Sequence, residues 1–135
     1  MEEILKQAGL FRELPGELIA RLAAEAVDRR TAAGDEVVRR GEEADSLFVV
    51  AEGEFEVYLP DPVIGDEKVL RTLGAGETFG EIAVFAEGMR TASVRSLGPG
   101  RLVQLDRSSC VAAVRKHPEL GLALCRVLAL SLIHI

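Results

Sequence analysis

Aromatic residues are scarce in this sequence: they make up 4% of its 135 residues, and tryptophan is missing altogether. Leucine, valine, isoleucine and alanine must therefore fill any interior. Because hydrophobic residues reach 48%, the chain can bury a core of its own, and its length suits one domain rather than two.

Side chains that bind metals are also few. The two cysteines, Cys110 and Cys125, and the two histidines, His117 and His134, do not cluster in the sequence. This spacing excludes a structural zinc site or an iron–sulfur cluster built from this chain alone, and we predict no metal and no resident cofactor. We interpret both cysteines as reduced core thiols of a cytoplasmic protein, since the chain opens Met-Glu-Glu and no signal peptide is visible.

Positive charge is in deficit as well, with a formal net charge of −6. Because a nucleic-acid-binding surface is basic, this balance predicts no direct contact with nucleic acid, and any anion must be bound in a local pocket. The most apolar run, residues 118–135, has about eighteen residues including Arg126, whereas a membrane helix needs about twenty. We therefore predict no membrane insertion.

Three segments differ in their patterning. Residues 1–30 carry apolar residues at helical spacing and predict N-terminal helices. Residues 31–106 contain short runs rich in β-branched and aromatic residues, separated by glycines, and predict an eight-stranded antiparallel jelly-roll barrel. Residues 107–135 predict two further helices, the first capped by Asp106 and the second beginning near Pro118. The predicted fold class is α+β, mainly β, in one domain.

The stretch FGEIAVFAEGMRTASV sets two opposite charges in an apolar run, and it is typical of a strand end followed by a glycine and one helical turn. Gly80 exposes bare backbone to a ligand. The amides of Glu81, Ile82 and Ala83 would be unpaired donors at a helix start, which bind anions. Arg90 adds a planar charged fork that suits phosphate oxygens.

Glu81 suits an anion site only if the ligand also donates a hydroxyl, as a ribose 2′-OH does. Glu81 and Arg90 together therefore indicate a ligand with a phosphate and a sugar hydroxyl side by side, which a cyclic nucleotide provides. The alternative is a plain ion pair between the two side chains in a barrel that binds nothing. Such a pair stabilises a fold only weakly and would not need Gly80.

The same stretch resembles the phosphate-binding cassette of the cyclic nucleotide-binding domain family, which includes catabolite activator protein, the regulatory subunits of cAMP-dependent kinase and cyclic-nucleotide-gated channels. The cassette spans residues 79–94. The resemblance extends before it to AGDEVVRRGEEADSLFVVAEGEFEVY and after it to RLVQLDRSSCVAAVRKHPELGLALCRVL, and so covers nearly the whole chain.

The resemblance implies a role for each matching cassette position. Arg90 would pair with the cyclic phosphate, and Glu81 would accept from the ribose 2′-OH. Gly80 and the amides of Ile82 and Ala83 would help to hold the sugar and the phosphate.

Base recognition is implied at three further positions. Thr91, next to Ala92 in the ligand-binding segment, stands where a threonine is associated with cGMP, because its hydroxyl can bond a guanine held syn. Val57 and Leu73 fall where relatives pack the purine. Each also has an ordinary reading, with Thr91 as a plain strand residue and Val57 and Leu73 as simple core.

Two positions depart from the family pattern. Met89 stands where many relatives have proline. Some relatives cover the base with an arginine or an aromatic residue of the last helix, whereas the nearest position here is Ser131, with Leu130, Ile133 and His134 around it. The sequence therefore does not identify the residue that would cover the base, and it does not decide between cAMP and cGMP.

We predict a non-enzymatic sensor for cAMP, cGMP or both, which transmits ligand occupancy through its C-terminal helix. The receiver would be a second copy of the chain, or a fused or partner effector domain. The alternative is the sensor half of a catabolite-activator-type transcription regulator whose DNA-binding domain is absent from this chain. A metal-dependent jelly-roll enzyme is rejected, because no histidine lies in a predicted strand.

Overall fold

The computed structural model describes residues 1–9, 11–12, 14–60, 63, 65–81, 84, 88–119 and 121–122. Its helices are α1 (Glu2–Gln7), α2 (Gly16–Glu25) and α4 (Arg107–Lys116). Its strands are β1 (Val27–Thr31), β2 (Glu36–Val38), β3 (Ser46–Glu52), β4 (Phe55–Pro60), β5 (Glu67–Leu73), β6 (Thr78–Phe79), β7 (Ser93–Ser96) and β8 (Gly100–Asp106).

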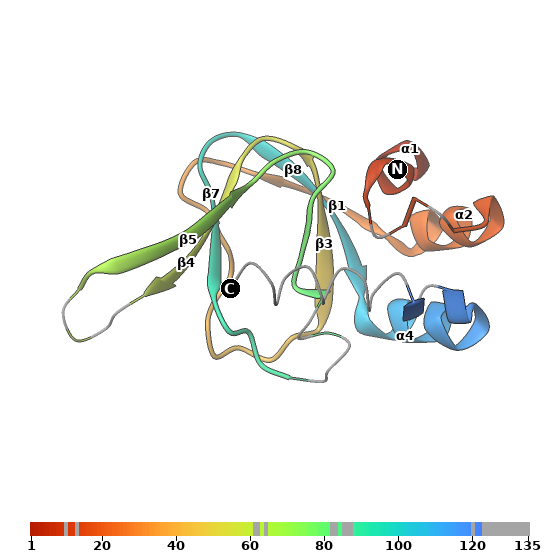
Figure 1. Cartoon of the computed structure of the whole chain (residues 1–135). Helices are drawn as coiled ribbons and strands as arrows, with labels where there is room; N and C mark the ends of the chain where they lie inside the picture. The colour runs from red at the N-terminus through yellow and green to blue at the C-terminus, as the bar shows by residue number, and fades with distance from the viewer. Residues whose placement is uncertain are drawn as a thin grey trace.

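The described strands form two antiparallel sheets of four strands each. One has the order β1-β8-β3-β6, and the other has the order β2-β7-β4-β5. The helices lie together beside the first sheet, while the long β4–β5 hairpin projects from the second (Figure 1). The chain is therefore mainly β, with a few helices on one side.

Strand β3 explains how one chain segment serves two cores. Its side chains alternate between two faces, as in any strand, yet five consecutive residues are buried. Leu47 and Val49 pack with the helices, whereas Phe48 and Val50 pack between the two sheets. The inner core between the sheets is where the candidate site lies.

The predicted closed barrel is not confirmed, because the described strands pair as two separate four-stranded sheets. β6, at the edge of one sheet, is only two residues long, and it stops where Gly80 turns the chain at φ +84°. β5, at the edge of the other, is exposed except at Leu73 and leaves the sandwich with β4 as a hairpin (Figure 1). The two edges therefore do not join.

The helical segment predicted for residues 1–30 is too long at its C-terminal end. Helix α2 ends at Glu25, and Val27–Thr31 forms β1 beside β8. The strand carries a single large apolar residue, Val27, which is itself exposed. Pairing with β8 and the 2.8 Å ion pair of Asp28 with Arg101 hold it in place.

The first C-terminal helix begins as its cap predicts. The Asp106 carboxylate accepts a hydrogen bond of 2.9 Å from the amide of Ser109, which starts α4. Cys110 in this helix is buried and free, and burial raises the pKa of its thiol to about 12. Cys125 and most of the second predicted C-terminal helix lie outside the described residues.

The described helices are all too short, or too polar, to cross a bilayer.

Candidate functional site

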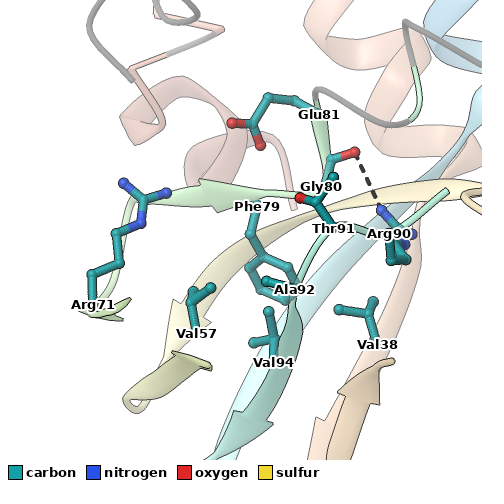
Figure 2. Close-up of a pocket in the computed structure, with 10 residues that line it drawn as sticks. All are labelled: Val38, Val57, Arg71, Phe79, Gly80, Glu81, Arg90, Thr91, Ala92 and Val94. Carbon is teal, nitrogen blue, oxygen red and sulfur yellow. Dashed lines mark hydrogen bonds between the residues drawn. The ribbon is translucent and has the colours of Figure 1, made fainter. Parts of the chain in front are cut away.

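A cavity of about 120 Å³ opens beside the inner core, between strands of both sheets (Figure 2). Its lining residues are Val38, Val57, Arg71, Phe79, Gly80, Glu81, Arg90, Thr91, Ala92 and Val94. Valines from β2, β4 and β7 form an apolar wall, and Phe79 is stacked on Phe48 at a centroid distance of 4.9 Å. Glu81 and Arg90 lie at the cassette end of this wall.

Gly80 makes room for the Arg90 side chain. A Cβ at this position would lie 2.5 Å from Nη1 of Arg90 and 3.3 Å from the carbonyl oxygen of Ser46. Its φ of +84° is also a conformation that favours glycine. The structure therefore adds packing around Arg90 to the backbone exposure predicted for this glycine.

Arg90 is a buried cation that is held by main-chain oxygens. Its side chain donates from Nη2 to Ser46 at 2.6 Å and from Nη1 to Gly80 at 3.2 Å, and its guanidinium lies 5.8 Å from the Phe48 ring centre. Only 6% of the residue is exposed. Within the described part of the chain, no carboxylate forms an ion pair with it. Carbonyl dipoles orient the group but do not supply a full negative charge in contact with it, which favours an anion nearby.

The electrostatics of Arg90 agree with this geometry. Burial lowers the pKa of its guanidinium, and the nearby carboxylates of Asp45 and Glu42 act in the opposite direction without pairing with it. An arginine stays charged even so, because its ordinary pKa is far above neutral. Arg90 is therefore a cation on the lining of the cavity.

Glu81 is a buried carboxyl with an unpartnered oxygen. The residue is 4% exposed, and its Oε2 has no hydrogen-bond partner among the described residues. Burial raises the pKa of this carboxyl, and the charges of Arg71 and Arg90 oppose the shift. An unsatisfied buried polar atom is rare in folded proteins and needs an explanation, and a donor on a ligand supplies one.

Glu81 and Arg90 do not form the ion pair that the sequence left open as the alternative. The two groups lie at the same end of the cavity, but the carboxyl turns away from the guanidinium (Figure 2). Arg90 contacts main-chain oxygens instead. The arrangement is that of two separate polar contacts facing one cavity.

Of the other predicted site residues, some line the cavity and some do not. Thr91, Ala92 and Val57 line the cavity. Leu73 is not among the lining residues; it is 1% exposed and belongs to the same buried cluster as Phe79 and Val94. Ile82 and Ala83 lie outside the described residues, as do the lid positions around Ser131.

Sequence reasoning missed Arg71, which is exposed on β5 and reaches the cavity from the side opposite Arg90 (Figure 2). Two signals could have found it. It lies two positions from Leu73 and so shares its strand face, and it pairs across the sheet with Val57. The register of β4 on β5 was needed for the second signal. Phe79, Val38 and Val94 were missed as lining residues for the same kind of reason.

Two facing sheets with a cavity that ends in a buried cation and a buried carboxyl define a small ligand-binding β domain. The family model described as "Cyclic nucleotide-binding domain" matches residues 28–117, more than half of the chain. This chain belongs to the cyclic nucleotide-binding domain family. The fold and the family thus confirm the resemblance seen in the sequence.

Similar proteins differ widely in their full length. The CRP-like cAMP-activated global transcriptional regulator of Mycobacterium tuberculosis is 32% identical over 129 residues, which are 96% of this chain and 57% of that protein. The cGMP-dependent protein kinase, isozyme 1, of Drosophila melanogaster is 36% identical over 107 residues, 78% of this chain and 14% of the kinase. The solved structure of the Thermus thermophilus catabolite activator protein has a TM-score of 0.82 at 29% identity, covering 93% of this chain and 58% of that one. This chain therefore spans little more than half of the two bacterial proteins and a small part of the kinase.

Proposed function

We propose that this chain is a sensor module that binds cAMP, cGMP or both. The observation that carries the proposal is the polar end of the cavity, where a buried guanidinium and a buried carboxyl with a free oxygen face the same space. A neutral ligand would leave the cation uncompensated, and a simple anion would leave the carboxyl unpaired. The sugar–phosphate ring of a cyclic nucleotide offers an anion and a hydroxyl donor next to each other, so it satisfies both groups.

The charge of the ligand also fits. A cyclic phosphodiester carries one negative charge, which a single arginine and oriented main-chain groups can balance. A phosphomonoester carries up to two charges at neutral pH and would enter a protein whose net charge is already −6. The site should therefore prefer cyclic nucleotides over 5′-AMP or 5′-GMP.

Each predicted residue keeps a defined role in this proposal. Arg90 binds the cyclic phosphate together with the amides predicted at Ile82 and Ala83, and Glu81 accepts from the ribose 2′-OH. Val57 packs against the purine on the wall of the cavity. Leu73 supports that wall from the core side.

Base selection would lie at exposed side chains that line the cavity. Thr91 is exposed there, with Ala92 beside it, and its hydroxyl can donate to or accept from a guanine. The charge of Arg71 adds a second cation on the facing strand. These side chains would distinguish cGMP from cAMP.

The output of the sensor would pass through the C-terminal helix to an effector in the same or another chain, or to a second copy. The bacterial relative, a cAMP-activated transcriptional regulator by name, supports the sensor half of such a regulator as a second candidate. Sequencing of the gene on both sides of this segment separates the candidates. A helix-turn-helix coding region would favour the regulator, and another kind of effector region would contradict it.

Titration calorimetry on the 135-residue chain tests the ligand assignment. We expect saturable binding of cAMP or cGMP, weaker binding of the 2′-deoxy analogue by about 1.5 kcal/mol or more, since a hydrogen bond to a charged group is lost, and weaker binding still of 5′-AMP. Absence of heat with both cyclic nucleotides, or equal affinity for 5′-AMP, would contradict the proposal.

A further inference from the structure

Aromatic side chains are concentrated in the inner core, next to Arg90. Three of the five phenylalanines of this chain, Phe48, Phe55 and Phe79, belong to the buried cluster between the two sheets. The rings of Phe48 and Phe79 are stacked, with 4.9 Å between their centres and 16° between their planes, and the Phe55 ring lies 6.2 Å from that of Phe79. This grouping brings the scarce rings of the chain to the wall of the cavity, through Phe79, and to Arg90, through Phe48.

The ring of Phe48 is a direct neighbour of the Arg90 guanidinium. The central carbon of the guanidinium lies over this ring, 5.8 Å from its centre, within the usual range of a cation–π contact. Both residues are buried. The face of an aromatic ring carries partial negative charge, and it attracts a cation more strongly where water is excluded. The ring therefore stabilises Arg90 in addition to the two main-chain oxygens that accept its hydrogen bonds.

Strand β3 presents both this ring and one of the two acceptors. Ser46, whose carbonyl oxygen accepts from Nη2 of Arg90 at 2.6 Å, lies two residues before Phe48 in the strand. The Phe48 backbone is fixed on both sides, because it pairs with Phe79 on β6 and with Gln104 on β8. Strand pairing and ring stacking together hold the Phe48 ring in one place, so that it forms a rigid support.

The orientation of the Arg90 guanidinium decides which of its donors a ligand can reach. A guanidinium has five N–H donors, and within the described part of the chain Arg90 uses two of them on the oxygens of Ser46 and Gly80. These two bonds still allow rotation about the line that joins the two oxygens. A third contact, with the face of a fixed ring, opposes that rotation.

We propose that Phe48 is a positioning residue for Arg90, and that its ring holds the guanidinium in the orientation that binds the phosphate of the ligand. The inference rests on the proposed function, because it assigns the remaining donors of Arg90 to a cyclic phosphate. Phe48 is not among the residues that line the cavity, so it acts through Arg90. Its contribution is preorganisation, since a guanidinium that the ring has already restricted loses less freedom when it binds.

Titration calorimetry with cAMP and cGMP on the 135-residue chain compares Phe48→Leu with the matched control Phe55→Leu. Both variants remove a buried ring from the same cluster, but only the first removes the ring that lies under Arg90. We expect Phe48→Leu to weaken binding by about fivefold or more, the scale of one cation–π contact, and Phe55→Leu to stay close to the wild type. If Phe48 were core and nothing else, the two variants would lose affinity alike.

Fluorinated phenylalanines at position 48 test the electrostatic contact with little change of shape. Each added fluorine withdraws charge from the ring face, which weakens its attraction for a cation. In the ligand-free chain, the midpoint of thermal unfolding should therefore fall stepwise from phenylalanine to the trifluorinated residue. In an Arg90→Met background, which has no cation at this position, the same series should show no such fall.

The outcomes separate this inference from the proposed function. Identical fluorine series in the two backgrounds overturn the inference, as do equal losses of affinity in Phe48→Leu and Phe55→Leu, and both results leave cyclic nucleotide binding by the wild type standing. If Phe48→Leu does not fold, calorimetry on the fluorinated chains replaces it, and an affinity that stays constant across the series overturns the inference. A wild type that binds neither nucleotide overturns both.

Discussion

Arg90 and Arg95 lie five positions apart, yet their charges are handled in opposite ways. Arg95, on β7, forms ion pairs of 2.6 Å with Glu56 and 2.7 Å with Glu67, and its guanidinium lies 4.2 Å from the ring centre of Tyr58. Arg90 is more deeply buried, and its hydrogen bonds within the described part of the chain go to main-chain oxygens. Arg95 is paired with carboxylates within the fold, whereas Arg90 forms no ion pair with a carboxylate among the residues that the structure describes.

The comparison shows what separates an architectural cation from a binding one. Side-chain hydrogen bonds to Glu67 and Glu56 raise the pKa of Arg95, while burial lowers the pKa of Arg90. A group that the fold has already satisfied gains little from a ligand. A group that the fold has buried and left uncompensated gains a great deal, so the predictions below separate these two arginines.

The largest expected effect is that of Arg90→Ala on ligand binding. Loss of the cation should weaken the binding of cAMP or cGMP by about 2–5 kcal/mol, the scale for removing one partner of a buried charge pair. Calorimetry measures the change, and Arg95→Ala serves as the matched control with unchanged affinity. Equal losses in the two variants would remove the distinction between them.

Gly80→Ala should disturb the buried arginine from the other side. The new Cβ would meet Nη1 of Arg90 at 2.5 Å, in a backbone conformation of φ +84°. We expect a loss of about 1–3 kcal/mol in the free energy of unfolding, measured by urea denaturation. Gly74→Ala is the control, because a Cβ there meets no atom within 4 Å, and it should be far milder. Similar losses at both glycines would refute the steric role.

Glu81→Gln should weaken ligand binding by about 1.5 kcal/mol, because a neutral amide accepts a weaker hydrogen bond from the 2′-OH than a carboxylate does. The loss should shrink with the 2′-deoxy analogue, which has no such hydroxyl. Calorimetry with both ligands decides, and an identical loss for the two would speak against the hydroxyl contact.

The same variant should be more stable than the wild type at pH 7 in the absence of ligand. Burial raises the pKa of Glu81, so the folded state holds this proton more firmly than the unfolded state. Wild-type stability should therefore fall as pH rises from the ordinary pKa of glutamate through the raised one. The advantage of glutamine should be smaller at pH 4 than at pH 7 in urea titrations, and the reverse order would show that Glu81 is stabilised as a carboxylate.

Thr91→Ala should reduce cGMP affinity by about 1 kcal/mol, the worth of one neutral hydrogen bond, and leave cAMP affinity nearly unchanged. Competition between the two nucleotides for one labelled ligand measures the ratio directly. Parallel losses would mean that Thr91 does not select the base.

The smallest effect is expected at Arg95, which is already paired with two carboxylates. Arg95→Gln should lower the free energy of unfolding by about 0.5 kcal/mol, since partly exposed ion pairs are screened by water. The loss should shrink further in high salt, which urea titrations at two salt concentrations would detect. A loss as large as that expected for Gly80→Ala would show that this outer cluster is a second centre of stability.

Local signals in the sequence were sufficient for much of the fold. Asp106 starts α4 as a cap must, and the alternating run FEVYL forms β4. Strand β1 was not predicted, because it forms by pairing with β8, for example of Val27 with Gln104. Such long-range pairing leaves no clear pattern in a sequence of five residues. Closure of the barrel likewise depends on how two distant edges meet, which strand propensity alone does not determine.

Several residues that line the candidate cavity could be named from the sequence. Glu81 and Arg90, which were predicted from their side chains, line one cavity with Thr91 and Val57, which the family resemblance implied. The partners of Arg90 were beyond reach, since the oxygen of Ser46 belongs to the main chain of a residue 44 positions away. Arg71 was missed because its place depends on the register between β4 and β5.

Both hydrogen-bond acceptors of Arg90 are peptide oxygens, and a peptide oxygen exists whatever side chain the residue carries. Saturation mutagenesis should therefore find intolerance at the arginine and at the glycine that makes room for it, but broad tolerance toward small replacements at position 46. The apolar walls could therefore be redesigned for a different base without changing how Arg90 is held, because its two hydrogen bonds do not depend on the side chains of the accepting residues.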